Sequence, residues 1–551
     1  MNRVIAGTIL VTCAGWLAFG QAPETQPKFE IADVHVSAKT TSQSYRAGLV
    51  RGGRYEVKAA TMVDLIKIAY GFDTDKILGG PNWLELDRFD VIAKAPADST
   101  ADSQKAMLQA LLEDRFKLVV HKDTKPLPAY ALTVGKKPQL KEAAGSEQTG
   151  CKLQSDSGAP AEGGRIMYRS PDGATATISL GPGMTILYQC RNITMAAFAA
   201  GLPGMMTTSL GSRQVSDETE LKGNWNFDLR YSLRIGGPMM ANQGDRISIF
   251  DAVDKQLGLK LEEKPIPTPG IVVDSVNRTP TENPPGVTEA LPSIPAPTEF
   301  EVASMKPTGP DSRNMGLRTQ PGGRLTAEGM PLRFLVNRAF NLNTSDQVVG
   351  LPKFADTDRY DIVAKAPSEA ASAPRMDMES VAPMIRALLV DRCKMTYHTE
   401  DRPVTAYSLV AAKPKMKKAD PDSRIFCKSA GAPVGAPPGS RVFTCQNITM
   451  AQFADRLQNL TPELNWPVPD ATGIQGGWDF SLTFSISSTM MAARPVGEPG
   501  QAAPDVPSAS VPAGGYTIFE AVEKQLGLKL EKQKRPLPVI VIDRFEKPAE
   551  N

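Results

Sequence analysis

The chain has 551 residues, more than one compact domain normally contains, so we expect at least two domains. Hydrophobic residues make up 41% and charged residues 22%, which excludes a chain that is disordered throughout. Lys and Arg total 62 against 60 Asp and Glu. This near balance gives no overall positive field, so the composition argues against nucleic acid or an anionic membrane as the partner.

The first 22 residues have the pattern of a signal peptide. Arg3 precedes an apolar run from Val4 to Phe19, and the small residues Ala18 and Gly20 have the spacing of a cleavage site. We therefore predict residues 1–22 as a leader and export to the periplasm or cell envelope. An uncleaved leader or a lipid on Cys13 would instead anchor the chain to the membrane. No later stretch has the ~20 apolar residues of a span, so no membrane span is expected apart from the leader.

Short units of strand and helix follow the leader. The segment "GRYEVKAATMVDLIKIAYGF" predicts a strand, a capped helix and a turn at Gly71. A helix is expected from about Ser103 to Phe116, then a strand "KLVVHKD" with a hairpin partner "AYALTV". "CRNITMAAFAAGLPG" again predicts strand, helix and turn. Each unit is small, so we predict an α+β fold in which such units pack as two-layer α/β sandwiches.

A longer unit closes the first half. Ser248 and Asp251 have the spacing of a capping box, which places a helix start there, and Gly258 is typical of a helix end. Leu259 and Leu261 then alternate with charged residues in strand period, and "PGIVVDSV" predicts a second strand after a turn.

Almost every one of these motifs occurs twice, in the same order. "IFDAVDKQLGLKLE" begins at Ile249, and "IFEAVEKQLGLKLE" begins 269 positions later at Ile518. "DRFDVIAKAP" and "CRNITMAAFA" likewise return as "DRYDIVAKAP" and "CQNITMAQFA". The chain is thus a tandem duplication, which we divide into a first copy, residues 23–278, and a second copy, residues 299–551.

Residues 279–298 lie between the copies and contain six prolines. We expect this Pro-rich linker to be an extended, semi-rigid spacer rather than a packed element. Length differences between the copies fall in loops, the largest being an insertion rich in Pro, Ala and Ser near Ser488–Gly515.

The repeat pairs the cysteines. Cys151 and Cys190 correspond to Cys427 and Cys445, so each copy of an exported chain is expected to carry one disulfide. A metal site is the alternative, although no CxxC motif or His cluster lies beside them. Cys393 takes the place of Phe116 on an apolar helix face, which predicts a buried free thiol.

The ordered motifs "FEIADVHVS", "LGGPNWLELDRFDVIAKAP", "MLQALLEDRFKLVVHKDTKPLPAYALTV" and "GNWNFDLRYS" resemble the soil-associated family of exported bacterial proteins built on domain of unknown function 3738. The resemblance covers nearly all of both copies. It departs from the usual single copy by the duplication, and in the second copy Phe354 replaces Trp83. The strand and "NITMAAFA" helix unit is distantly similar to the short N-terminal domains of secretins and TonB-dependent receptors, which implies docking or signalling. Neither resemblance supplies a catalytic residue.

Few residues are candidates for chemistry. Three histidines are too few and too scattered for a metal site, and no GxSxG motif supports a serine nucleophile. Adjacent Asp and Arg could gather a ligand carboxylate, although neighbours on a strand point to opposite faces and structural pairing is the favoured interpretation. The candidate ligand or partner contacts are Trp83, Asp87, Arg88, His121, Asp358, Arg359 and His398.

Two functions of different class remain open. The favoured one is an exported, non-catalytic binding or protein-interaction protein of the cell envelope, whose partner is an unknown envelope protein or a small ligand. The alternative is an exported hydrolase with a site assembled around the Asp-Arg and His positions. No catalytic residue, metal or cofactor is predicted for the favoured function.

Overall fold

The structure is a computed structural model of the chain. It describes residues 27–38, 45–49, 53–135, 137–145, 148–154, 165–169, 175–179, 185–206, 210, 213–232, 247–291, 297–309, 315–320, 322–342, 347–367, 378–431, 440–458, 460–461, 463–464, 466–485 and 515–548. The predicted leader with Cys13, and the insertion up to residue 514, lie outside these ranges. Among the helices described, none combines the length and the apolar composition needed to cross a membrane.

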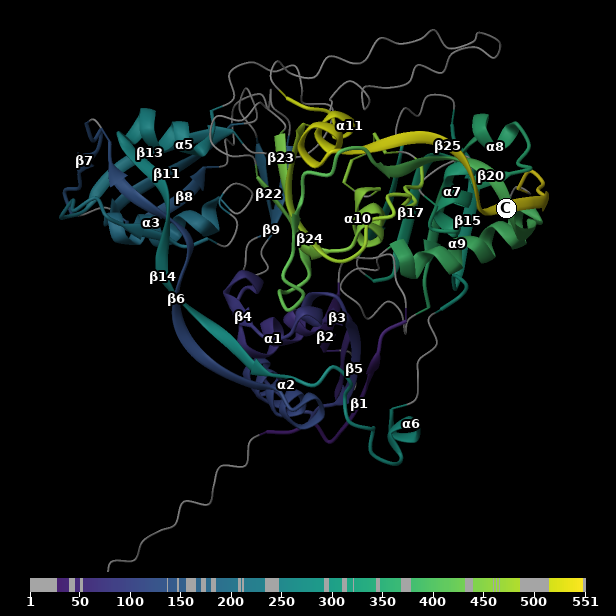
Figure 1. Cartoon of the computed structure of the whole chain (residues 1–551), viewed down its shortest axis with the longest axis horizontal. Coiled ribbons are helices and arrows are strands. Elements are labelled where there is room, and N and C mark those ends of the chain that lie inside the picture. The colour runs from purple at the N-terminus through teal and green to yellow at the C-terminus, as the bar shows by residue number, and fades with distance from the viewer. Residues whose placement is uncertain are drawn as a thin grey trace, which may run out of the picture.

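Each copy folds as two small α+β units joined by two long paired antiparallel strands (Figure 1). We call this strand pair the long hairpin, although its strands are joined by the whole second unit and not by a turn. In the first unit of the first copy, the antiparallel sheet has the order β1-β5-β3-β2. Helices α1 and α2 pack on one face of it around a core that includes Phe89 and Phe116. The bounds are β1 (Ile31–Val36), β2 (Arg46–Leu49), β3 (Arg54–Thr61), α1 (Met62–Tyr70), η2 (Thr74–Lys76), η3 (Asn82–Glu85), β5 (Arg88–Lys94) and α2 (Ala101–Phe116).

The second unit has a sheet of order β7-β13-β11-β8, covered by α3 and by the short helix at residues 249–257. That helix begins at the Ser248 cap and ends at Gly258, which has a φ of 66°, as the sequence predicts. The bounds are β7 (Lys141–Glu142), β8 (Gly150–Gln154), β11 (Thr185–Ile193), α3 (Met195–Met205), β13 (Trp225–Ser232), α5 (Ile249–Ala252) and the π-helical turn η6 (Val253–Leu257). Between β8 and β11 in the chain, β9 (Arg165–Arg169) and β10 (Thr175–Ser179) pair as a separate two-stranded sheet.

The connection between the units differs from the prediction. "KLVVHKD" and "AYALTV" are not partners in a hairpin but the two ends of one strand, β6 (Val119–Val134). The two strands expected after Gly258 are likewise one strand, β14 (Leu259–Ser275). The two strands pair with each other along their length, and β12 (Val215–Asp217) and β4 (Ile77–Gly79) extend the sheet at opposite ends. Both units therefore share this hairpin.

Proline explains why the sequence suggested a break. Pro126 lies opposite Pro267, and Pro128 lies opposite Pro265. In an antiparallel ladder, alternate pairs exchange no backbone hydrogen bonds, and a residue without an N–H fits such a pair without cost. The two prolines on each strand are two positions apart, so all four fall in pairs that exchange no backbone hydrogen bonds. The ladder therefore continues past them.

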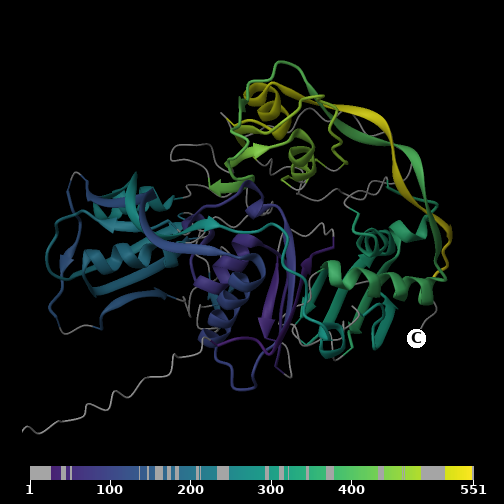
Figure 2. The same cartoon turned by 60° about the horizontal axis from the view of Figure 1, so that its bottom comes forward.

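The second copy repeats the design. Its first unit has the sheet β15-β19-β17-β16, its second unit has β21-β24-β23-β22, and β20 and β25 form the long hairpin (Figures 1 and 2). The bounds are β15 (Val302–Pro307), β16 (Gly316–Gln320), β17 (Arg324–Pro331), α7 (Leu332–Ala339), β18 (Val348–Val349), α8 (Phe354–Thr357), β19 (Arg359–Lys365), α9 (Met378–Cys393), β20 (Thr396–Ala411), β21 (Lys417–Lys418), β22 (Phe426–Gly431), β23 (Ser440–Ile448), α10 (Met450–Leu457), β24 (Trp478–Ser485), α11 (Ile518–Ala521), η10 (Val522–Leu526) and β25 (Leu528–Arg544).

The linker is not the extended spacer that its prolines predict. It contains a short helix, α6 (Val287–Ala290), and Val287 and Leu291 pack on Ile92 of the first sheet. Arg115 of α2 fixes the segment just before α6. Its guanidinium donates to the carbonyl oxygen and hydroxyl of Thr281 and to the side-chain oxygen of Asn283. Prolines flank α6 but do not occur inside it, which leaves the helical turn possible.

Replacing Arg115 by methionine is expected to lower the free energy of unfolding by about 2 to 3 kcal/mol. Arg115 is 3% exposed, and its loss would leave the oxygens of Thr281 and Asn283 without their donor. Chemical denaturation measures this loss. The equivalent Arg392→Met is the control and should cost less, since that side chain is 32% exposed. Equal losses would contradict the role given to Arg115.

Candidate functional site

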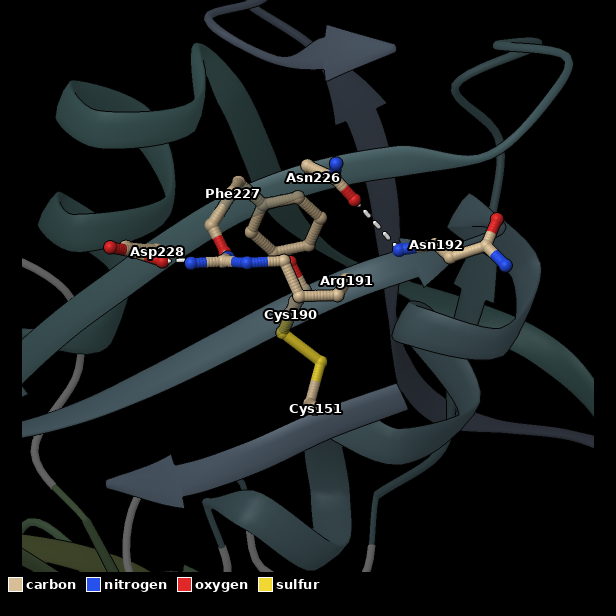
Figure 3. Close-up of a disulfide and its surroundings, with 7 residues drawn as sticks. All are labelled: Cys151, Cys190, Arg191, Asn192, Asn226, Phe227 and Asp228. Atoms are coloured by element: carbon tan, nitrogen blue, oxygen red, sulfur yellow. Dashed lines mark hydrogen bonds and ion pairs between the residues drawn. A yellow bond between two sulfur atoms is a disulfide. The ribbon is translucent and has the colours of Figure 1, made fainter. Parts of the chain in front are cut away.

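Both predicted disulfides are present. Cys151 of β8 bonds to Cys190 of β11, and Cys427 of β22 bonds to Cys445 of β23. In each copy the two cysteines lie directly opposite each other on neighbouring antiparallel strands. Figure 3 shows the pair of the first copy. The competing metal interpretation is wrong for these residues, because their sulfurs are bonded to each other.

A β-bulge follows the disulfide in each copy. Asn192 adopts a φ of 46° and Asn447 a φ of 50°, the left-handed conformation that asparagine tolerates better than most residues. The backbone amide of Asn192 donates to the side chain of Asn226 at 2.7 Å (Figure 3). The backbone amide of Asn447 donates to Asp479 at 2.9 Å in the same way. Disulfide and bulge together fix the strand that leads into α3 and α10.

Cys393 is the free thiol that the repeat predicts, and it is fully buried. Burial raises the pKa of its thiol to about 12. The reactive thiolate is therefore scarce near neutral pH. We expect Ellman's reagent to label no cysteine in a native chain that begins at residue 23 and one cysteine in guanidinium chloride. Native labelling within minutes would contradict the buried position.

Trp83, Asp87 and Arg88 do not form one ligand site. Trp83 is 6% exposed and packs edge-on against Phe89 in the first core. Asp87 accepts two hydrogen bonds from the guanidinium of Arg278, and the side chain of Arg88 donates to the carbonyl oxygen of Ala59. The contacts of Asp87 and Arg88 thus connect strand β5 to other segments, in agreement with the favoured structural interpretation.

The candidates of the second copy are equivalent in part. Asp358 pairs with Lys547 at 2.8 Å, and the hydrogen bond from Lys547 lowers the pKa of Asp358. Lys547 and Arg278 each follow the long hairpin of their copy, so the aspartates play the same role twice. Arg359 begins β19 with an exposed side chain.

The two equivalent histidines lie on the hairpins, away from the Asp-Arg positions. His121 contacts Asp274 at 2.8 Å across β6 and β14, and His398 contacts Asp543 at 3.0 Å across β20 and β25. Both rings are about half exposed. The contacts found for His121 and Asp87 lead to different partners, so no observation favours the hydrolase site that the sequence left open.

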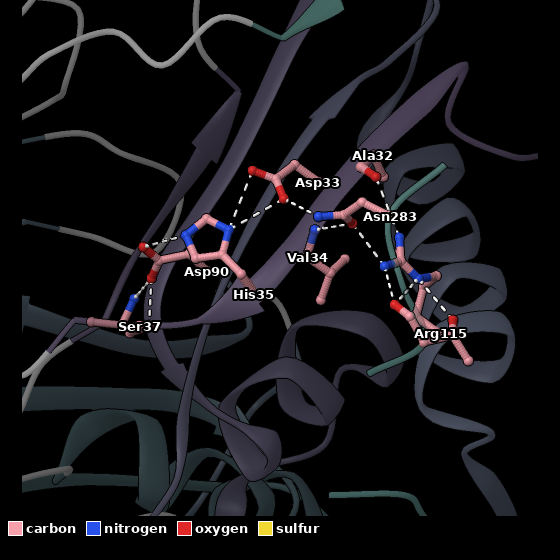
Figure 4. A network of polar contacts seen from close by, with 10 residues as sticks. Ala32, Asp33, Val34, His35, Ser37, Asp90, Arg115 and Asn283 are labelled. Carbon is pink, nitrogen blue, oxygen red and sulfur yellow. Dashed lines mark hydrogen bonds and ion pairs between the residues drawn. The ribbon is translucent and has the colours of Figure 1, made fainter. Parts of the chain in front are cut away.

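A third histidine belongs to a polar network on the first sheet (Figure 4). His35 lies 3.2 Å from Asp33 and 3.6 Å from Asp90, but the hydroxyl of Ser37 donates to Asp90, not to the imidazole. Asp90 also accepts from the backbone amide of Ala59 in the bulge of β3.

The second copy identifies what this network does. Asp361 takes the place of Asp90 and accepts from the Thr308 hydroxyl and from the amide of Gly329. Lys306 stands where the first copy has His35. The bulge contact therefore persists without histidine, which assigns the aspartate a structural role. Among the described residues, no group of three or more His, Cys, Asp or Glu is arranged to hold a metal ion.

The two copies contact each other between the first unit of the first copy and the second unit of the second copy (Figure 1). Arg424 pairs with Glu85 and also donates to the carbonyl oxygen of Ile77. The backbone amide of Ile425 donates to the carbonyl oxygen of Asn82 at 2.9 Å. We call this the inter-copy contact.

Charges in the inter-copy contact are largely withdrawn from water. The side chains of Arg424 and Glu85 are 14% and 15% exposed. Burial lowers the pKa of Arg424, and the attraction of Glu85 opposes this. Burial also lowers the pKa of Arg456 in α10, and the positive charge of nearby Arg88 lowers it further. The charge of Arg88, one of the predicted candidates, thus acts across the copies.

A cleft of about 410 Å³ opens beside this contact. Its wall carries the buried pair and the more exposed Lys428, whose ammonium lies 3.6 Å from Glu85 and over the ring of Phe426. Residues of both copies line it: Thr74, Asp75, Ile77, Leu78, Gly79, Gly80 and Glu85 from the first, and Asp422, Ser423, Arg424, Phe426, Lys428 and Gln446 from the second.

Sequence reasoning missed Glu85, Arg424 and Lys428. The duplication itself carried a signal for two of the three, because Asp356 replaces Glu85 and Gln148 replaces Arg424. Lys428 gave no such signal, since the first copy has Lys152 at the same place. Asp356 is paired with Arg333 inside its own unit. The second unit of the first copy and the first unit of the second copy therefore lack the Arg–Glu pair that joins the copies at the inter-copy contact.

Comparison with known proteins identifies the repeat. Residues 63–276 and 333–545 each match the family described as protein of unknown function, DUF3738. The chain belongs to this family. The two DUF3738 matches begin inside α1 and α7 and end after the long hairpins, so they include the second unit of each copy whole and the first unit from its first helix onward. No curated protein and no solved structure matches the chain.

Proposed function

We propose that this DUF3738 protein is an exported, non-catalytic binding protein of the cell envelope, and that the cleft between its copies is its ligand site. One observation carries the proposal: residues of both copies line the cleft, beside a buried ion pair that joins them. The leader pattern and the two disulfides support export.

The cleft favours a small polar ligand. Its volume of about 410 Å³ falls within the range of small-molecule sites, and charged groups outnumber aromatic ones on its wall. Lys428 is 42% exposed and can turn from Glu85 toward a ligand anion, while Phe426 provides a flat apolar surface. A molecule with an anionic group beside a planar or apolar part would use both.

Equilibrium dialysis of the exported chain against a small-molecule extract of the cell envelope tests the proposal. We expect mass spectrometry to find a molecule enriched with the wild type and enriched at least tenfold less with Lys428→Glu. Lys105→Glu is the matched control, because Lys105 is 48% exposed and likewise pairs with a carboxylate, Asp102 on α2, but does not line the cleft. Equal enrichment by all three proteins, or none by the wild type, would refute the cleft as the site.

A further inference from the structure

The outer face of the first sheet in the first copy is covered by the linker. Helix α6 places Val287 and Leu291, four positions apart, on Ile92 and Ile31 of strands β5 and β1. Ile92 is 8% exposed as a result. Asn283, just before α6, accepts from the backbone amide of Val34 and so ties the segment to β1 (Figure 4).

The equivalent face of the second copy is open. Val302 and Val363 stand 271 positions after Ile31 and Ile92, on strands β15 and β19. Val302 is 65% exposed and Val363 is 42% exposed. An apolar pair that the first copy buries is therefore in contact with solvent in the second. We call Val302, Val363 and their outer-face neighbours the open sheet face.

The open sheet face has also changed its charge. In the first copy, Asp33 and Glu56 lie opposite Ile92 on the two neighbouring strands. In the second copy, Ser304 and Thr326 lie opposite Val363. Two carboxylates are lost beside Val363, and Lys306 and Arg324 form a basic rim at exposed positions of the same strands. Farther along β17 the exposed Glu328 replaces Lys58, and Lys365 is paired with Glu301 at 3.5 Å.

The segment that covers the first copy has matching properties. Residues 279–291 contain Glu282 and Glu289 and neither Lys nor Arg. Carboxylates in such a segment would meet no acidic residue opposite Val363, where Ile92 has two, and would lie near the basic rim of Lys306 and Arg324.

We propose that the open sheet face of the second copy is a docking site for an acidic segment of a partner protein. The segment forms one helical turn with two aliphatic residues four positions apart. The aliphatic pair covers Val302 and Val363 as α6 covers their equivalents, and its carboxylates face the basic rim. This surface is separate from the inter-copy cleft, so either can fail without the other.

Methyl NMR of the chain from residue 23, with labelled valine, tests the proposal. The probe is a synthetic peptide of residues Thr279–Leu291, because the first copy already holds its own tethered segment. We expect the Val302 and Val363 signals to shift saturably with the peptide. A peptide with Val287→Ser and Leu291→Ser is expected to bind at least tenfold more weakly.

Val363→Asp in the full chain should abolish peptide binding at the remaining Val302 signal. Val390→Asp is the matched control, since Val390 is also 42% exposed but lies on α9 away from this sheet face. Folding of both variants is checked by the unchanged signals of Val336 and Val381, which are buried in the same unit of the second copy. Peptide binding that survives Val363→Asp, equal shifts with the serine peptide, or no saturable shift at millimolar peptide would overturn the proposal. Self-association in sedimentation that Val363→Asp removes would assign the face to a second copy of this chain and would also overturn it.

Discussion

Replacing Cys151 and Cys190 together by alanine is expected to lower the free energy of unfolding of the first copy by about 4 kcal/mol. The disulfide closes a loop of 39 residues, and by the chain-entropy argument such a crosslink destabilises the unfolded chain by about that amount. The strand that carries Cys190 also leads through the Asn192 bulge into α3, so the loss is concentrated in the second unit. Hydrogen exchange of the amides in β11 and α3 locates the effect, and chemical denaturation measures its size.

The second copy supplies the matched comparison. Cys427 and Cys445 close a loop of 18 residues, so their replacement should cost about 3 kcal/mol and act on the second copy alone. A double replacement without measurable loss in either copy would show that the disulfides follow from the fold and do not stabilise it.

Replacing Gly258 by alanine is expected to cost about 3 to 5 kcal/mol, as is replacing Gly527. Each glycine ends the helix of its copy in the left-handed conformation, with φ values of 66° and 67°. An added Cβ would overlap the carbonyl oxygen of Lys137 or Lys413, and a backbone atom cannot turn away as a side chain can. The cost combines left-handed strain with forced displacement of the neighbouring segment. Thermal or chemical unfolding measures it.

Gly71 separates these two causes. It ends α1 with a φ of 74°, but an added Cβ there would meet no atom within 4 Å. Gly71→Ala should therefore cost only about 1 kcal/mol, the strain alone. A loss at Gly71 as large as at Gly258 would contradict the steric explanation.

The sequence predicted a local feature correctly where all the residues that produce it lie in one short segment. Ser248 and Thr517 cap the helices of the repeated "KQLGLKLE" motif as their spacing predicts. Thr100 caps α2, which begins at Ala101, two residues before the predicted start near Ser103. The prediction failed in the long hairpins, where proline suggested turns within what are continuous strands. Whether a proline breaks a strand depends on which residue of the neighbouring strand lies opposite it. That residue is far away in the sequence, so the segment around the proline does not reveal it.

The sequence by itself determined the duplication, the α+β class, the cysteine pairing and the helix ends, because each depends on a repeat or on contacts between near neighbours. Only the tertiary structure decided that Glu85 meets Arg424, that the linker covers Ile92, and that Val363 stays exposed. These contacts join residues from distant parts of the chain, and their partners are chosen by how the long hairpins place the units. A hydrophobic pattern predicts that a residue has a buried face, but it does not name the segment that buries it.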